Sequence, residues 1–131
     1  MLITDPISDL FIRIKNGLMA KKKEVNMPHS KLKEAIAHKL VENNYIEAVE
    51  IIDKIPQKEM NIKLRYVESL AGITGFKRIS KPGRRLYAGV NKVPPALNGY
   101  GITLVSTNRG VLTDKEAREK NVGGELICQI W

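Results

Sequence analysis

The spacing of hydrophobic residues changes character near the middle of this chain, and that change limits the folds open to it. In the first helix candidate, apolar side chains recur at helical spacing, at Ile7, Leu10, Phe11, Ile14 and Leu18. Such spacing predicts an amphipathic helix with one face on a core. From residue 71 onward glycines multiply, and the helical period gives way to short runs of β-forming residues. We therefore expect two small domains, residues 1–72 and 73–131.

The first half predicts two helices and a small sheet. Asp5 is a good N-cap with Pro6 at the first helical position, and Ser30 can cap a second helix. The second helix is expected to end at Asn43 and Asn44, and its predicted core residues are Leu32, Ala35, Ile36 and Leu40. Residues 25–28 read as a short extended piece, and residues 45–53 and 59–67 as two strands joined by a turn. We expect the two helices to pack on a small three-stranded sheet.

The second half predicts short strands and one short helix. Strand candidates lie at residues 76–79, 85–88 and 102–107, and turns at Lys81–Arg84 and Pro94–Pro95. Thr113 and Glu116 fit the capping box that starts a helix. The last run alternates, which predicts one face shared by Leu126, Cys128 and Ile130. The expected class is α+β, with a C-terminal domain that is mostly antiparallel β.

The positive charge of the chain is concentrated in this second half. Of the net charge of +8, residues 1–70 carry +2 and residues 71–131 carry +6. No acidic residue stands between Ser69 and Thr113, where the basic residues are Lys77, Arg78, Lys81, Arg84, Arg85, Lys92 and Arg109. Charge kept only for solubility is usually interspersed with acids, so we expect a polyanionic partner. The run Lys21–Lys23 fits a solvated helix end and a phosphate contact equally well.

Several classes of protein are disfavoured. The start of the chain does not resemble a signal peptide, and no apolar run approaches the roughly 18 residues of a membrane span, so we expect a cytoplasmic protein with no membrane partner. The lone Cys128 reads as a small core residue, and His29 and His38 as structural or surface residues, because no zinc spacing is present. No catalytic set assembles either. We expect no metal, no cofactor and no enzyme activity.

RNA is the partner that the second half fits best. Ser106, Thr107 and Asn108 can form hydrogen bonds to base or ribose edges, while Arg109 and the helix after Thr113 would position a phosphate. Tyr87 can stack on a base, or it can be a sheet residue half in the core. A general nucleic-acid-binding module, or an enzyme that binds phosphate at the Thr113 helix, remains as an alternative.

The chain resembles the bacterial eighth protein of the small ribosomal subunit, the S-eight family, over essentially its full length. The motifs that carry this resemblance are Asp5-Pro6-Ile7, Arg13-Ile14-Lys15-Asn16-Gly17, Met27-Pro28, Ser30-Lys31-Leu32-Lys33, Ser80-Lys81-Pro82-Gly83, Tyr87, Val105-Ser106-Thr107, Gly110-Val111, Thr113-Asp114 and Gly123-Gly124-Glu125. Asn108 stands where many members have Ser, and Arg109 where many have Lys.

The resemblance implies a specific RNA partner. Members bind an irregular helix in the central domain of small-subunit ribosomal RNA and help to assemble the platform beside neighbouring ribosomal proteins. They can also bind a mimic of that helix in their own operon's messenger RNA, as translational autoregulators. By this similarity Ser106, Thr107 and Asn108 contact bases, Tyr87 stacks, and Glu125 supports them. The expected RNA-binding set is Lys31, Lys81, Arg84, Arg85, Tyr87, Ser106, Thr107, Asn108, Arg109, Gly124 and Glu125, with Lys31 marking a second contact in the N-terminal domain.

Overall fold

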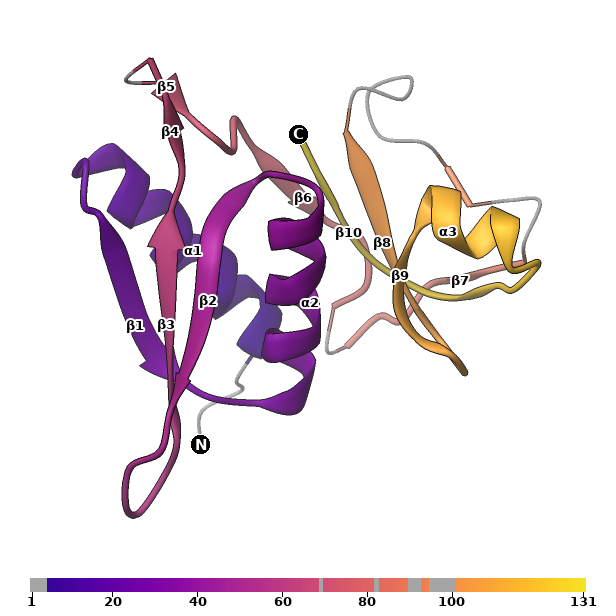
Figure 1. Ribbon diagram of the computed structural model, residues 1–131. Helices are drawn as coiled ribbons and strands as arrows, with labels where there is room; N and C mark the ends of the chain where they lie inside the picture. Colours follow the sequence, from indigo (N-terminus) through magenta and orange to yellow (C-terminus); the bar gives the residue numbers. More distant parts are fainter. Residues whose placement is uncertain (1–4, 69, 82, 90–92, 95–100) are drawn as a thin grey trace. The chain divides into compact units, whose positions relative to one another are not determined.

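The computed structural model describes residues 5–68, 70–81, 83–89, 93–94 and 101–131 (Figure 1). The chain divides into two compact units, the first ending at Ile73 and the second beginning at Thr74. Lys92 and the prolines of the expected turns, Pro82 and Pro95, lie outside the described residues.

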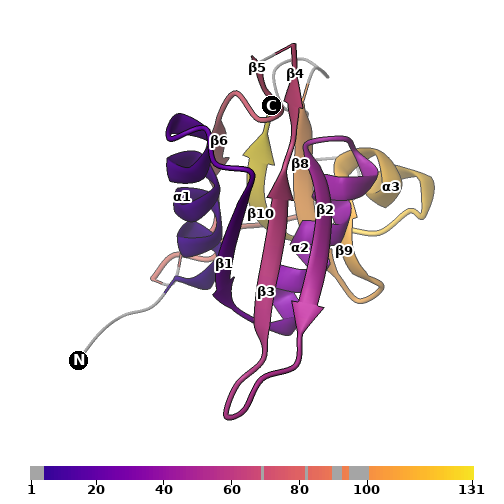
Figure 2. The same ribbon diagram turned by 60° about the vertical axis from the view of Figure 1, so that its left-hand side comes forward.

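Unit 1 contains two helices and a three-stranded antiparallel sheet. Its elements are α1 (Pro6–Met19), β1 (Glu24–Pro28), α2 (Lys31–Glu42), β2 (Ile46–Ile52), β3 (Glu59–Leu64), and the small hairpin β4 (Tyr66–Val67) and β5 (Leu70–Ala71). The strand order is β1-β3-β2, with β3 between the other two (Figure 2). The expected two helices on a three-stranded sheet are therefore confirmed, although Tyr66 belongs to the separate hairpin.

The helix starts follow the predicted caps. The Asp5 carboxylate accepts hydrogen bonds from the backbone N–H groups of Ile7 and Ser8 at 3.2 Å, and the Ser30 hydroxyl accepts one from Lys33 N at 3.1 Å. Each cap satisfies donors that the first helical turn leaves unpaired. Both helices bury a face against the strands, and the fully buried residues include Leu10 and Phe11 of α1, Ile36 and Leu40 of α2, and Met60 and Ile62 of β3.

The predicted face of α2 was only half right. Ile36 and Leu40 are buried, but Leu32 is 38% exposed, and the residues that complete the buried face are Ala37 and Lys33, which is 6% exposed. The face that points inward therefore runs through positions 33, 36, 37 and 40, one residue round from the expected one. The aliphatic stem of a lysine can cover apolar surface, so Lys33 tolerates this position.

Unit 2 is an antiparallel sheet with one short helix. Its elements are β6 (Phe76–Arg78), β7 (Tyr87–Ala88), β8 (Ile102–Thr107), β9 (Gly110–Thr113), α3 (Asp114–Glu119) and β10 (Gly124–Ile130). The sheet order is β6-β10-β8-β9, and β7 also pairs with β10. The expected α+β class is confirmed. The capping box is present as well, with Glu116 N donating to Thr113 Oγ1 and Thr113 N to Glu116 Oε1.

Strand β9 was missed, because its four residues lie between a polar turn and a helix cap and look like one loop in the sequence. It pairs with β8 from Thr107 opposite Gly110 to Leu104 opposite Thr113. The pairing makes residues 102–113 a β-hairpin. This hairpin fixes the positions of Ser106, Thr107 and Asn108, which are predicted to contact RNA.

A β-bulge in β10 divides its side chains between the two faces of the sheet. Leu126 lies opposite Val105, but Cys128 lies opposite Leu104, so Ile127 is an extra residue. Because paired residues share a face and neighbours alternate, Leu126 and Cys128 point to opposite faces. The prediction that Leu126, Cys128 and Ile130 share one face is therefore wrong. We call the face with Leu104 and Cys128 face A, and the face with Val105 and Leu126 face B.

Candidate nucleic-acid interface

Three predicted site residues line up across three strands of unit 2. Tyr87 of β7 lies opposite Glu125 of β10, which in turn lies opposite Ser106 of β8. Residues opposite one another in antiparallel strands have side chains on the same face, so these three form one row on face A, which we call the Tyr87 row. Although they are far apart in the sequence, the sheet brings them together.

Tyr87 presents its ring to solvent. The residue is 70% exposed, which excludes the alternative that its ring is half in the core. An exposed aromatic ring in the middle of a polar row offers a flat surface on which a base can stack.

The Glu125 carboxylate holds a basic side chain beside that ring. Arg85 Nη1 donates to Glu125 Oε2 at 3.0 Å. Arg85 is two residues from Tyr87 in the chain. A guanidinium has five donors, so Arg85 keeps donors for a phosphate while one is bound by the carboxylate.

Thr107 has a different environment from its neighbours. Its Oγ1 accepts a hydrogen bond from Arg109 N at 3.0 Å and donates one to Gly110 O at 2.8 Å. Both bonds lie within the turn that joins β8 to β9. Thr107 therefore shapes this turn, and its hydroxyl is already occupied in the free protein.

The polar side chains on either side of Thr107 differ from it in their hydrogen bonding. Ser106, Asn108 and Arg109 have no side-chain hydrogen bond to the part of the chain that the structure describes, and Asn108 and Arg109 are exposed. Gly110 has φ of +98°, a conformation that side chains rarely adopt, and it closes the turn. The turn thus presents an amide and a guanidinium next to the Ser106 hydroxyl.

Gly124 allows this part of the sheet to be closely packed. A Cβ atom at Gly124 would clash with the backbone O of Ser106 and lie 3.2 Å from Thr107 Cα. Only glycine lets β10 run this close to the end of β8. Its contribution to the site is therefore the separation of two strands, not a side-chain contact.

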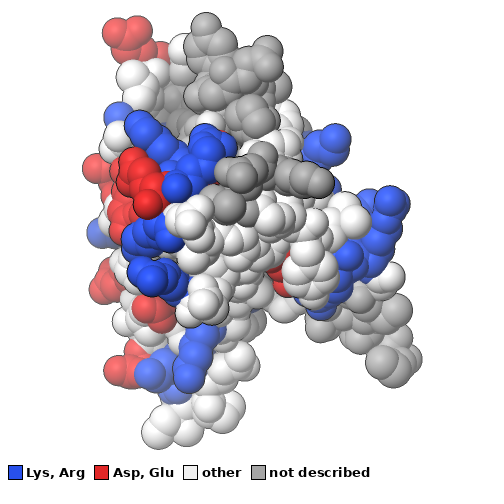
Figure 3. All heavy atoms as spheres, turned by 90° about the vertical axis from the view of Figure 1, so that its right-hand side faces the viewer, with Lys and Arg blue, Asp and Glu red and all other residues white. Residues whose placement is uncertain are grey.

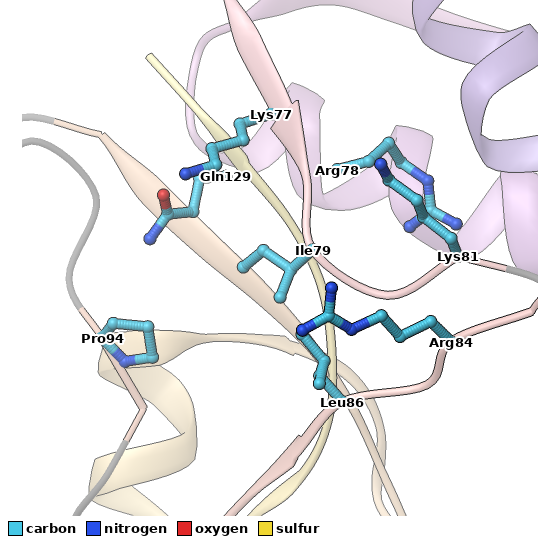
Figure 4. Close-up of a pocket in the computed structure, with 8 residues that line it drawn as sticks. All are labelled: Lys77, Arg78, Ile79, Lys81, Arg84, Leu86, Pro94 and Gln129. Atoms are coloured by element: carbon cyan, nitrogen blue, oxygen red, sulfur yellow. The ribbon is translucent and has the colours of Figure 1, made fainter.

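Lys81 and Arg84 lie elsewhere in unit 2. Their backbones form an isolated β-bridge, and both side chains are exposed. They help to line a cavity of about 500 Å³, whose full lining is Lys77, Arg78, Ile79, Lys81, Arg84, Leu86, Pro94 and Gln129 (Figure 4). Sequence reasoning counted Lys77 only as part of the positive charge and missed Gln129. Nothing in the sequence indicates that Lys77 and Gln129, which are far apart in the chain, line the same cavity.

The charge environments of the two units differ. In unit 1 acids accompany the bases, as in the pairs Asp9–Arg13, Lys39–Glu42 and Lys54–Glu59. The face in Figure 3 shows Lys and Arg in groups, with Asp and Glu interspersed over part of it. Within the described residues of unit 2, by contrast, no acid lines the cavity of Lys81 and Arg84. A cavity lined by cations and by no described acid fits a polyanion.

Lys31 belongs to unit 1, as the first residue of α2. The helix dipole is unfavourable for a positive charge at this end of a helix, so Lys31 does not stabilise α2 through the dipole. Nearby, His29 Nε2 lies 2.6 Å and His38 Nε2 3.2 Å from the two oxygens of Glu34. These hydrogen bonds, first that of His29 and then that of His38, lower the pKa of the Glu34 carboxyl.

Lys33 lies in a cavity of about 600 Å³ next to this cluster. Its ammonium is 3.9 Å from Asp9 Oδ2. Burial lowers the pKa of Lys33, and the negative charge of Asp9 acts in the opposite direction. Like Lys33 with Asp9, His29 and His38 have a carboxylate partner, Glu34, in keeping with the structural role predicted for the two histidines.

The start of α3 is already occupied by the chain's own acids. Asp114 Oδ1 accepts from Thr103 N at 3.3 Å and Asp114 Oδ2 from Arg118 Nη2 at 3.2 Å, while Glu116 completes the capping box. Two acids in the first turn oppose the approach of a phosphate. The idea that this helix end cradles an anion receives no support from its geometry.

Among the described residues, no cluster of His, Cys, Asp or Glu has a metal-binding arrangement. No helix in the same part of the chain is long and apolar enough to cross a bilayer.

Known proteins resemble this chain over its whole length. A family model described as ribosomal protein S8 matches residues 5–131. The small ribosomal subunit protein uS8 of Dictyoglomus thermophilum is 47% identical over 131 residues, which cover both chains completely. The uS8 protein of Clostridioides difficile is 45% identical over 132 residues, again all of both chains. That of Mycoplasma mobile is 46% identical over 130 residues, covering 99% of this chain and 98% of the relative.

Proposed function

The chain belongs to the ribosomal protein S8 family, and from this membership we propose that it binds the RNA of the small ribosomal subunit, with the Tyr87 row as its main recognition element. The family consists of ribosomal proteins and not of enzymes, which confirms the prediction that the chain is not an enzyme. The phosphate-binding enzyme is therefore dropped as an alternative.

The observation that carries the proposal is the Tyr87 row itself. An exposed ring, a hydroxyl without a hydrogen bond to the described residues and an arginine held by Glu125 lie together at one end of the sheet. Stacking, hydrogen bonds to base or ribose edges and a charge-assisted contact to phosphate are the three interactions by which proteins recognise irregular RNA. The turn at Asn108 and Arg109 extends the row.

The finer parts of the proposal come from the family resemblance. The RNA is an irregular helix of the central domain of small-subunit ribosomal RNA, and binding helps to assemble the platform beside neighbouring ribosomal proteins. The same surface binds a mimic of that helix in the operon's messenger RNA. Lys31 of unit 1 makes a second, weaker RNA contact.

Binding to matched nucleic acids tests the function. The ligands are an RNA hairpin with an irregular, unpaired interruption, the same hairpin with the interruption fully paired, and the paired sequence as DNA. We expect the irregular RNA to bind more tightly than either control, since only unstacked bases expose their edges to side chains. Equal affinity for all three would indicate a general nucleic-acid-binding module. Crosslinking in cells with sequencing of the bound RNA then identifies the natural target.

A further inference from the structure

The cavity of Lys81 and Arg84 is lined in part by side chains on the other face of the sheet from the Tyr87 row. Gln129, one of its lining residues, lies opposite Thr103 and beside Lys77 in the sheet. Thr103 alternates with Leu104, so Gln129 and Lys77 are on face B. Glu125, only four residues before Gln129, is on face A. Four residues along a regular strand would bring the side chain back to the same face; the extra Ile127 prevents this.

Four cations line this cavity, and one of them, Arg78, donates from Nη1 to Ile127 O at 2.7 Å. Lys77, Lys81 and Arg84 have no ion-pair partner among the described residues. Nearby acids of unit 2 are engaged elsewhere, Glu125 with Arg85 and Asp114 with Arg118. Four like charges around one hollow repel one another, and an anion placed between them reduces that repulsion.

Apart from its four cations and the Gln129 amide, the lining of the cavity is apolar. Ile79, Leu86 and Pro94 provide an aliphatic surface, and Ile79 packs on the buried cluster of Val93, Val105 and Leu126. In Figure 4 the Ile79 side chain lies between Lys77 and Arg84, and the Arg84 side chain extends toward Leu86. An inorganic ion alone would need no such surface, whereas the flat ring of a base would cover it.

Gln129 is held in a defined position at the edge of the hollow. Its Nε2 donates to Thr103 Oγ1 at 3.4 Å, and Thr103 Oγ1 donates to Pro94 O at 2.6 Å. This chain of hydrogen bonds orients the amide and leaves its carbonyl oxygen as an acceptor. An oriented amide is a group that discriminates among base edges.

We propose that this cavity binds one unstacked nucleotide of the RNA, with its phosphate on Lys77, Lys81 and Arg84, its base over Ile79 and Leu86, and a base edge on Gln129. The site deepens the proposed function and rests on it. RNA would then be bound on both faces of one sheet, with the Tyr87 row contacting one segment and the cavity another.

The test uses the full chain and an irregular hairpin RNA that the wild type binds. The cavity variants are the double substitution Lys77→Gln with Arg84→Gln, and the single Gln129→Leu. The matched control is Lys115→Gln with Lys120→Gln, which removes two exposed charges at α3, outside the cavity. Chemical probing of each bound RNA shows which nucleotides are protected, and melting temperatures show that the variants are folded.

The double cavity variant should lower affinity by about 10- to 100-fold and reduce the slope of log K against log salt by roughly 0.7 to 0.9, as expected when one phosphate is no longer neutralised. Gln129→Leu should leave the slope unchanged and remove the protection of a single nucleotide, while the nucleotides whose protection depends on Tyr87 stay protected. The control should change affinity much less.

Three results would overturn the proposal. One is a control variant that loses as much affinity and slope as the cavity variant. Another is an unchanged protection pattern in Gln129→Leu, which would reduce the cavity to a phosphate contact. The third is that a free mononucleotide saturates the cavity while every protein variant binds the hairpin RNA as tightly as the wild type does. A wild type that binds no RNA at all would instead refute the proposed function, so the two failures are distinguishable.

Discussion

Thr107 shapes the β8–β9 turn, since its hydroxyl makes two hydrogen bonds there. Thr107→Val keeps the β-branched shape but removes both bonds. We expect a loss of about 1–3 kcal/mol in RNA binding, because each of the two hydrogen bonds is worth about 0.5–1.5 kcal/mol and their loss displaces the turn. Thr107→Ser keeps the hydroxyl and should lose much less. Titration of one RNA with all three proteins checks this, and unchanged binding by the Val variant would show that the turn has no part in recognition.

Tyr87 is exposed, so its replacement separates stacking from stability. Tyr87→Ala should weaken RNA binding by about 1–3 kcal/mol, the usual cost of losing a base–aromatic stack. The melting temperature of the free protein should hardly change, because the ring is 70% exposed. Tyr87→Phe keeps the stacking surface and serves as the control. A large fall in melting temperature with intact binding would assign the ring to structure instead.

Glu34 gives unit 1 a defined pH dependence. Since hydrogen bonds from His29 and His38 lower its pKa below the ordinary value of 4.5, the folded protein keeps this carboxylate charged to lower pH than the unfolded chain does. Its stabilising contribution is therefore present above pH 4.5 and disappears as the pH falls through the lowered pKa. The stability gap between wild type and Glu34→Gln should narrow over that range.

Urea unfolding at a series of pH values measures this gap. Glu42→Gln is the matched control, because Glu42 is an exposed acid on the same helix that pairs with Lys39. A gap that stays constant down to pH 3 would contradict the role of the histidine hydrogen bonds.

At the scale of single residues, chemistry was easier to predict than environment. The side chains of Tyr87, Ser106 and Arg85 were recognisable as candidates for stacking, hydrogen bonding and phosphate contact from residue type and family resemblance. The internal use of the Thr107 hydroxyl was not, because it depends on the geometry of a two-strand turn. The burial of Lys33 in place of Leu32 was missed as well, since two overlapping sets of positions on α2 have almost the same helical spacing.

At the scale of elements, two glycines in the hairpin region have different roles. A Cβ at Gly110 would meet open space, so Gly110→Ala costs only the strain of φ +98°. That strain is about 1 kcal/mol of folding stability. Gly124→Ala pushes a methyl group against the backbone of Ser106 and should cost about 1–3 kcal/mol. It should also weaken RNA binding, because it separates β10 from β8.

Denaturant unfolding and RNA titration of both glycine variants test this difference. Equal effects of the two substitutions on RNA affinity would mean that the separation of β8 and β10 does not matter for the interface.

Elements with a cap or a clear period were predictable. Helices α1, α2 and α3 have the expected N-caps, Asp5, Ser30 and Thr113. Caps of this kind are predictable because a capping residue acts on backbone groups only two or three positions away. Strand β9 was not predictable, since four residues are too few to show a period. The bulge at Ile127 was not either, because a bulge is a mismatch between two strands and cannot be read from one of them.

At the scale of the whole molecule, salt dependence measures how much of the binding is electrostatic. If about four to six phosphates are neutralised, log K should fall against log salt with a slope of roughly −3 to −5. Affinity measured at several salt concentrations gives this slope. A flat response would mean that the positive charge of residues 71–131 does not contact phosphate, and would contradict RNA binding through this half.

The extra residue in β10 works like a frame shift in the alternation of side chains. Removing Ile127 would turn the bulge into a regular ladder, because Cys128 would follow Leu126 directly and still lie opposite Leu104. Gln129 would stay opposite Thr103 on face B, and Cys128 and Ile130, both fully buried, would stay on face A. What the strand would lose is the bend and the added twist that a bulge produces. The extra residue therefore sets the local curvature of β10, while the partners on β8 set which face each side chain occupies.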